Sequence, residues 1–161
     1  METNNNFKWY VTRDNFLSKE ECEEIINISN KSNKKINEQR YLDKVWKVMQ
    51  LSNNLYYKFD VDGIQLQEVK YYDEDTFEED NELHSDFAAG PDRTDTNTKL
   101  TSVVFLNDDY KGGELQVWGE KIESKQGRIV ILPSFAGHKV NQFYDGNRYT
   151  LITVVKGNTF K

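Results

Sequence analysis

Cysteine is nearly absent from this sequence, and its scarcity excludes whole classes of protein. Cys22 is the only cysteine among 161 residues, so no intramolecular disulfide can form and nothing points to secretion. A structural zinc module is also a poor interpretation, because such sites close tetrahedrally and favour cysteine ligands. The content of 37% hydrophobic and 13% aromatic residues is typical of a folded protein. With 161 residues, the chain is long enough to bury a hydrophobic core as one domain.

An excess of basic residues and long apolar runs are missing as well. The net charge of −6 and the pI near 5.0 argue against a nucleic-acid partner, because phosphate binding needs a concentrated basic surface. No stretch approaches the roughly 20 apolar residues of a membrane span, and residues 1–6 lack the pattern of a signal peptide. We therefore expect a cytoplasmic protein with neither a nucleic-acid nor a membrane partner.

The first third of the sequence carries helical patterns. The motif Ser18-Lys19-Glu20-Glu21 is a capping box, in which the serine hydroxyl and the last glutamate satisfy each other's backbone amides. An apolar stripe at helical spacing follows it, and a second stripe predicts a helix from about Asp43 to Phe59. We expect residues 1–62 to form a helical support that covers one side of a sheet.

From Gly63 onward the apolar pattern alternates with a period of two, which is typical of strands. Turn residues, with no helices, separate these runs, which favours an antiparallel sandwich or barrel. The expected strands cover residues 64–71, 100–106, 114–118, 128–132 and 149–155. The predicted fold class is mainly β with N-terminal helices (α+β), with residues 63–161 as the β core of a single domain spanning residues 1–161.

The sequence has two histidines, and both lie in settings that suit a metal ligand. On an extended segment His84 and Asp86 would point to the same side, and His138 from a facing strand would add a second imidazole. Two imidazoles and one carboxylate are the ligand set of non-haem Fe(II) oxygenases. For the His-x-Asp triplet alone, a surface histidine beside a solvated aspartate is the better explanation.

A basic residue follows the second histidine, where a dicarboxylate cosubstrate would need one. Turn residues 145–147 separate Arg148 from His138, so the two are expected on adjacent antiparallel strands. The guanidinium suits bidentate recognition of a carboxylate, and Thr150 on the same face offers a hydroxyl. The alternative for Arg148 is a surface arginine at a hairpin end. Taken together, these residues predict an Fe(II)- and 2-oxoglutarate-dependent oxygenase.

The order of several motifs resembles the prolyl 4-hydroxylase branch of the 2-oxoglutarate oxygenases over nearly the whole chain. Residues 14–22 are similar to the family's N-terminal entry, a Phe-Leu-Ser turn into a Glu-Glu-Cys helix. The strand and Gly-Gly-x-Leu turn that follow in the family are matched by Phe105-Leu106-Asn107 and Gly112-Gly113-Glu114-Leu115. Its closing strands are matched by residues 127–134, 137–140 and 146–149.

The resemblance implies a double-stranded β-helix, or jelly-roll, whose open end holds iron. Its metal ligands would be His84, Asp86 and His138. The cofactors would be Fe(II), 2-oxoglutarate as cosubstrate and O₂, with ascorbate a candidate addition. The far carboxylate of the cosubstrate would lie on Arg148. Because related halogenases leave the position of Asp86 empty for chloride, the aspartate favours hydroxylation.

Further site residues and the substrate follow from the same resemblance. Tyr71 falls where family members place a tyrosine on the far carboxylate, and an ordinary core tyrosine is the equal alternative. Phe105 replaces a tyrosine of the oxygen-sensing enzymes, so Tyr71 or Thr150 must supply the missing hydroxyl. Arg93 falls where those enzymes have an arginine that contacts substrate. A charged loop residue with no role in the site explains it at least as well.

The expected activity is hydroxylation of an unactivated C–H bond, with a prolyl residue in a peptide or protein as the substrate. One alternative is a hydroxylase of another side chain or of a free amino acid. Another is a non-catalytic jelly-roll that binds a metal or a small acid.

Overall fold

Two helices precede most of the strands in a computed structural model of the chain, which describes residues 7–77 and 96–158. Helix α1 (Lys19–Lys31) begins with the predicted capping box: Ser18 Oγ accepts from the Glu21 amide at 3.1 Å, and Glu21 Oε1 accepts from the Ser18 amide at 3.0 Å. Helix α2 (Gln39–Ser52) continues into a π-helical turn, Asn53–Tyr57. Among the described residues, no helix is long and apolar enough to cross a membrane.

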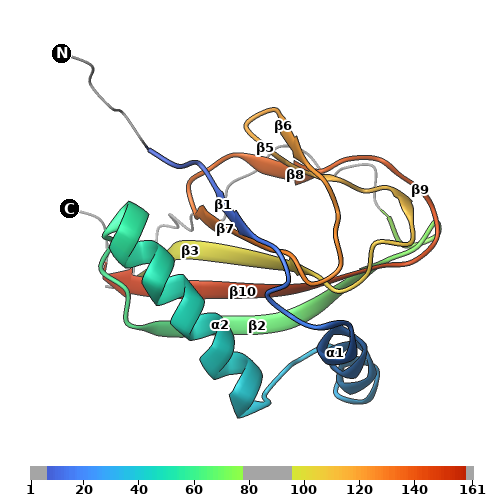
Figure 1. Cartoon of the computed structure of the whole chain (residues 1–161), viewed down its shortest axis with the longest axis horizontal. Coiled ribbons are helices and arrows are strands. Elements are labelled where there is room, and N and C mark those ends of the chain that lie inside the picture. The colour runs from blue at the N-terminus through green and yellow to red at the C-terminus, as the bar shows by residue number, and fades with distance from the viewer. Residues whose placement is uncertain (1–6, 78–95, 159–161) are drawn as a thin grey trace.

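The strands of the described residues form three antiparallel sheets (Figure 1). The largest has the order β1-β7-β3-β10-β2, the second has the order β6-β5-β8, and β4 pairs with β9. The bounds are β1 (Val11–Arg13), β2 (Gly63–Tyr72), β3 (Thr96–Phe105), β4 (Lys111–Gly112), β5 (Leu115–Val117), β6 (Glu120–Ile122), β7 (Ile129–Pro133), β8 (His138–Val140), β9 (Phe143–Asp145) and β10 (Arg148–Asn158).

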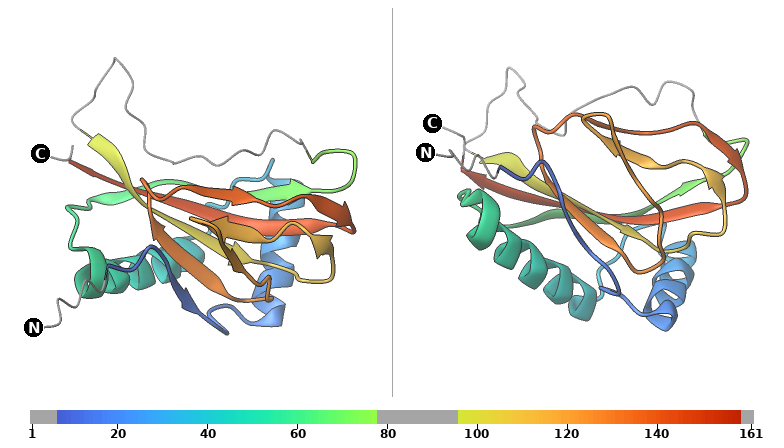
Figure 2. Two further views of the ribbon diagram at one scale, coloured as in Figure 1. Left: turned by 90° about the horizontal axis from the view of Figure 1, so that it is seen from above. Right: turned by 45° about the horizontal axis from the view of Figure 1, so that its top comes forward.

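The helices cover one face of the five-stranded sheet, and the smaller sheets lie over its other face (Figure 2). Side-chain alternation along β3 separates the two layers. Leu100 and Val104 pack in the cluster that contains the helix residues, whereas Val103 and Phe105 pack against β5 and β7. Burying each such side chain contributes about 1.5–3 kcal/mol. This arrangement confirms the predicted mainly β fold with N-terminal helices.

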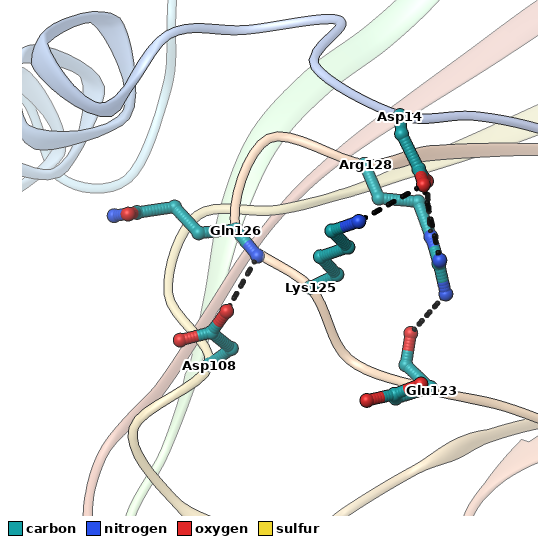
Figure 3. A network of polar contacts seen from close by, with 6 residues as sticks. All are labelled: Asp14, Asp108, Glu123, Lys125, Gln126 and Arg128. Carbon is teal, nitrogen blue, oxygen red and sulfur yellow. Dashed lines mark hydrogen bonds and ion pairs between the residues drawn. The ribbon is translucent and has the colours of Figure 1, made fainter.

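A short strand in the N-terminal segment attaches that segment to the sheet. Strand β1 pairs with β7, Val11 lying opposite Ile131. Beyond the strand, the Asp14 carboxylate accepts from Arg128 Nε at 2.6 Å and from Lys125 Nζ at 3.1 Å (Figure 3). These two cations lower the pKa of Asp14 to about 2. Residues 7–62 therefore contribute a strand to the sheet as well as the two predicted helices.

Candidate active site

A small, partly open cavity lies between the inner face of β10 and the facing strand β8. Alternation along β10 directs Arg148, Thr150 and Ile152 to the same face. The neighbouring strand β2 places Tyr72 opposite Arg148, and Lys70 opposite Thr150. The cavity has a volume of about 70 Å³, and its lining consists of Lys70, Tyr72, Thr101, Val103, Leu115, His138, Val140, Arg148, Thr150 and Ile152.

The charge at one end of this cavity is a buried arginine. The Arg148 side chain is only 2% exposed, and its Nε donates to the carbonyl oxygen of Gly113 at 2.9 Å. Its guanidinium carbon lies 5.7 Å from the centroid of the Tyr72 ring, within the range of a cation–π contact. Burial lowers the pKa of Arg148, but a guanidinium has so high a starting pKa that it stays protonated.

No carboxylate among residues 7–77 and 96–158 forms an ion pair with Arg148. The phenol of Tyr110 interacts with the guanidinium and donates to Ser124 Oγ at 2.6 Å. Because a buried charge is costly unless an opposite charge accompanies it, this end of the cavity suits an anion.

A hydroxyl group without a partner lies on the same face of β10. Thr150 is fully buried, and its Oγ1 has no hydrogen-bond partner in the described part of the chain. A buried hydroxyl left unsatisfied costs about 1–3 kcal/mol. A carboxylate that accepts from both Arg148 and Thr150 would remove this cost and neutralise the buried charge, so the two residues fit the far carboxylate of 2-oxoglutarate.

The buried His138 is the first residue of β8. The separation between its Nδ1 and the carbonyl oxygen of Ala136 is 3.0 Å, the distance of an N–H···O hydrogen bond. A carbonyl oxygen can only accept, so we assign a proton to Nδ1, and Nε2 is the ring atom that would ligate a metal ion. The sequence-based expectation that His138 and Arg148 lie on adjacent strands is wrong. Strand β8 belongs to the three-stranded sheet and β10 to the five-stranded sheet, so the two side chains line the cavity from facing sheets.

Three of the predicted site residues, His84, Asp86 and Arg93, lie outside the described residues. Among those that are described, no three side chains form a potential metal site. The ligand set of His84, Asp86 and His138 therefore stays a prediction, with His138 as its described member.

The structure does not bring Tyr71 to the cavity. Tyr71 pairs with Tyr149, and the two rings pack with centroids 4.8 Å apart on the helix-covered face of the sheet. Its hydroxyl donates to the Asp73 carboxylate at 2.9 Å. The next residue, Tyr72, faces Arg148 instead. Sequence analysis missed Tyr72, Lys70 and Tyr110. The two-residue alternation could have identified the first two, had the register of β2 against β10 been known.

Comparison with known proteins identifies the family. Residues 68–155, more than half of the chain, match the family model of the 2OG-Fe(II) oxygenase superfamily, and the chain belongs to that superfamily. It is a 2-oxoglutarate-dependent dioxygenase, so the predicted enzyme class is confirmed, as are Fe(II), 2-oxoglutarate and O₂ as its cofactors. No curated protein matches the sequence.

Solved structures of prolyl hydroxylases share the fold. The viral collagen prolyl hydroxylase of Paramecium Bursaria Chlorella virus-1 superposes with a TM-score of 0.78 at 17% identity, covering 99% of this chain and 97% of that one. A Pseudomonas putida prolyl-4-hydroxylase gives 0.69 at 14% identity, covering 94% of both chains. A Trichoplax adhaerens prolyl hydroxylase, in complex with a peptide fragment, gives 0.68 at 15% identity, covering 93% of this chain and 84% of that one. These likenesses confirm the predicted jelly-roll.

Proposed function

We propose that this dioxygenase hydroxylates prolyl residues in a peptide or protein, and that residues 1–161 act as a single domain. Two observations on the cosubstrate side support a functional site: the buried Arg148 has no carboxylate partner among the described residues, and the Thr150 hydroxyl beside it has no hydrogen-bond partner there. The shared fold with prolyl hydroxylases supports the choice of substrate.

In this proposal the cavity binds 2-oxoglutarate by its far carboxylate. Arg148 and Thr150 donate hydrogen bonds to that carboxylate, while Lys70 adds positive charge at the exposed edge of the cavity. Tyr72, which packs against the guanidinium, replaces Tyr71 in this site. The apolar side chains of Val103, Leu115, Val140 and Ile152 exclude water, and this strengthens the charge interaction.

The metal would be held by His84, Asp86 and His138. The hydrogen bond from Nδ1 of His138 to Ala136 orients the imidazole for this role. When bound, Fe(II) and 2-oxoglutarate would supply the activation of O₂, one atom of which would enter a substrate C–H bond while the other would enter the succinate formed, with CO₂, from the cosubstrate. The protein supplies the binding, the orientation and the dry surroundings.

Incubation with Fe(II), 2-oxoglutarate, O₂ and proline-rich peptides tests the proposal. We expect a peptide mass gain of one oxygen atom, located on proline by fragmentation, with succinate formed in equal amount. The variants His138→Ala and Asp86→Ala should abolish both products. If peptides gain no oxygen while 2-oxoglutarate binds normally, the prolyl substrate is wrong and another side chain or a free amino acid becomes the better candidate.

A further inference from the structure

Asn107 lies two residues beyond the end of β3, where the backbone ladder between β3 and β10 stops. The last pair of this ladder is Phe105 with Thr150. Arg148, at the start of β10, pairs with Tyr72 of β2 on one side, but no residue of β3 within the described strands pairs with it on the other. The backbone around the buried arginine therefore depends on other contacts on the β3 side.

The side chain of Asn107 supplies these contacts. The carbonyl oxygen of Tyr149 still accepts from the Leu106 amide at 3.0 Å, but the Tyr149 amide donates to Oδ1 of Asn107 at 2.9 Å. The Nδ2 of Asn107 donates to the carbonyl oxygen of Asn147 at 2.6 Å. A carboxamide carries both a donor and an acceptor, as a backbone peptide group does. It thus binds both of the peptide groups that flank the Cα of Arg148.

The orientation of the Asn107 side chain is itself fixed by a third hydrogen bond. Its Nδ2 also donates to Oδ1 of Asp109 at 2.8 Å. Because Nδ2 faces two acceptors and Oδ1 faces a backbone N–H, the hydrogen-bond network assigns the nitrogen and oxygen of the amide without ambiguity. Both protons of Nδ2 are used, so the half-buried side chain is held in one orientation.

Holding the two flanking peptide groups fixes the direction in which the Arg148 side chain leaves the strand. Each residue has only two soft backbone dihedrals, and these are set once the peptide planes on both sides are held. The guanidinium lies at the end of a long side chain, so a small rotation of the backbone displaces it relative to the Thr150 hydroxyl. A binding constellation must be held within about 0.5 Å of its productive geometry.

We infer that Asn107 is a positioning residue of the cosubstrate site, which holds the backbone of Arg148 so that the guanidinium meets the far carboxylate of 2-oxoglutarate. The inference rests on the proposed binding of that carboxylate by Arg148 and Thr150. Asn107 does not line the cavity, so it acts through Arg148 alone. Its loss therefore weakens ligands that carry the far carboxylate and leaves ligands without that group unaffected.

Calorimetric titration of the enzyme, loaded anaerobically with Fe(II), with 2-oxoglutarate and separately with oxalate tests this inference. Oxalate can chelate a metal ion through two adjacent oxygens but lacks the far carboxylate. The key variant is Asn107→Ala. The matched control is Gln126→Ala, because Gln126 Nε2 donates to the Leu106 carbonyl at 3.0 Å. The control thus also removes a bond from a side chain to the backbone beyond β3, but not one to residues 147–149.

We expect Asn107→Ala to raise the dissociation constant of 2-oxoglutarate by roughly fivefold or more, as for residues coupled within one hydrogen-bond network. The dissociation constant of oxalate should stay within about twofold, and Gln126→Ala should leave both ligands within that range. Retained oxalate binding also shows that the variant is folded. Unchanged 2-oxoglutarate affinity would overturn the inference. Equal weakening of both ligands would give Asn107 a general structural role and overturn it as well.

A double-mutant cycle with Arg148→Met separates this inference from the proposed function. Once the arginine is gone, Asn107→Ala should cause no further loss of 2-oxoglutarate affinity, because nothing remains for it to position. Additive losses would overturn the inference. Weaker binding in Arg148→Met but not in Asn107→Ala would overturn the inference alone, and normal binding in Arg148→Met would overturn the proposed cosubstrate site with it. No peptide enters these titrations, so prolyl hydroxylation is tested independently.

Discussion

The Nε of Arg148 donates to the backbone carbonyl of Gly113 at 2.9 Å, and this contact depends on the absence of a side chain at residue 113. Gly113 has a φ of +67°, and a Cβ there would lie 3.1 Å from Cδ of Arg148. The turn Gly112-Gly113 thus allows the backbone to approach the arginine closely. It thereby positions the side chain that we propose binds the cosubstrate.

Gly113→Ala should therefore impair both the fold and the site. The positive φ alone costs about 1–3 kcal/mol of unfolding free energy for an alanine, and the added methyl group displaces Arg148. Gly119→Ala is the matched control, because Gly119 also has positive φ, +84°, but no atom lies within 4 Å of its Cβ position. Chemical denaturation should give a loss for Gly119→Ala and an equal or larger loss for Gly113→Ala, while calorimetry should give weaker 2-oxoglutarate binding for Gly113→Ala alone.

Arg148→Met should affect stability and binding in opposite directions. Without cosubstrate, the variant loses a buried charge that has no carboxylate partner among the described residues, so its thermal unfolding temperature should stay equal or rise. Its 2-oxoglutarate affinity should fall by about 2–5 kcal/mol, which is roughly 30-fold or more. Arg40→Met, an exposed arginine on α2, serves as the control. An unaltered affinity in Arg148→Met would refute the role of this arginine.

Thr150→Val should weaken cosubstrate binding without loosening the fold. Valine has nearly the shape of threonine and removes a buried hydroxyl that is unsatisfied in the described residues. The protein without cosubstrate should be as stable as the parent or slightly more stable. Loss of one hydrogen bond to a carboxylate should raise the dissociation constant of 2-oxoglutarate roughly tenfold. A variant that binds 2-oxoglutarate as tightly as the parent would remove Thr150 from the proposed site.

The Asp14 carboxylate should make stability depend on pH in the acid range. Its hydrogen bonds and ion pairs with Arg128 and Lys125 (Figure 3) lower its pKa to about 2 in the folded protein. A lowered pKa means that the carboxylate stabilises the fold above its unfolded pKa of about 3.9. This contribution is lost as the pH falls from there towards about 2.

Asp14→Asn is the variant that isolates this effect. In denaturant titrations near neutral pH, it should be less stable than the parent protein. At a pH near 2 the difference between the two proteins should shrink, because the carboxylate of the parent is then being protonated. A difference that stays constant over this range would mean that the ion pairs of Asp14 do not contribute.

Several elements of the fold could be predicted because their signals are local. The capping box at Ser18 marks the start of α1, the two-residue alternation marks β2, and short apolar or β-rich runs mark β3, β7 and β10. The bounds of α2 carry weaker signals: the side chain of Glu38 makes no capping bond, and Lys58, rather than a glycine, adopts the left-handed conformation after the helix. The predicted helix at 43–59 therefore starts four residues after Gln39, the first residue of α2, and ends beyond Tyr57, the last residue of the π-helical turn.

The candidate site depends on long-range pairing that the sequence does not reveal. Arg148 was predicted because it is the basic residue that follows His138 after a turn, and Thr150 because it lies two residues further along the same strand. Choosing Tyr72 rather than the predicted Tyr71 required the register of β2 against β10, because a one-residue error moves a side chain to the opposite face. The separation of His138 and Arg148 onto facing sheets likewise arises from the order of the strands, and no local motif encodes it.

The most direct test of the central claim is an anaerobic absorption titration of the metal-free protein with Fe(II) and then 2-oxoglutarate. We predict a weak visible charge-transfer band that appears only with both present, disappears in His138→Ala, and requires a much higher 2-oxoglutarate concentration in Arg148→Met. No band, or a band unchanged in His138→Ala, would contradict the proposal that the cavity between β8 and β10 holds the metal and cosubstrate.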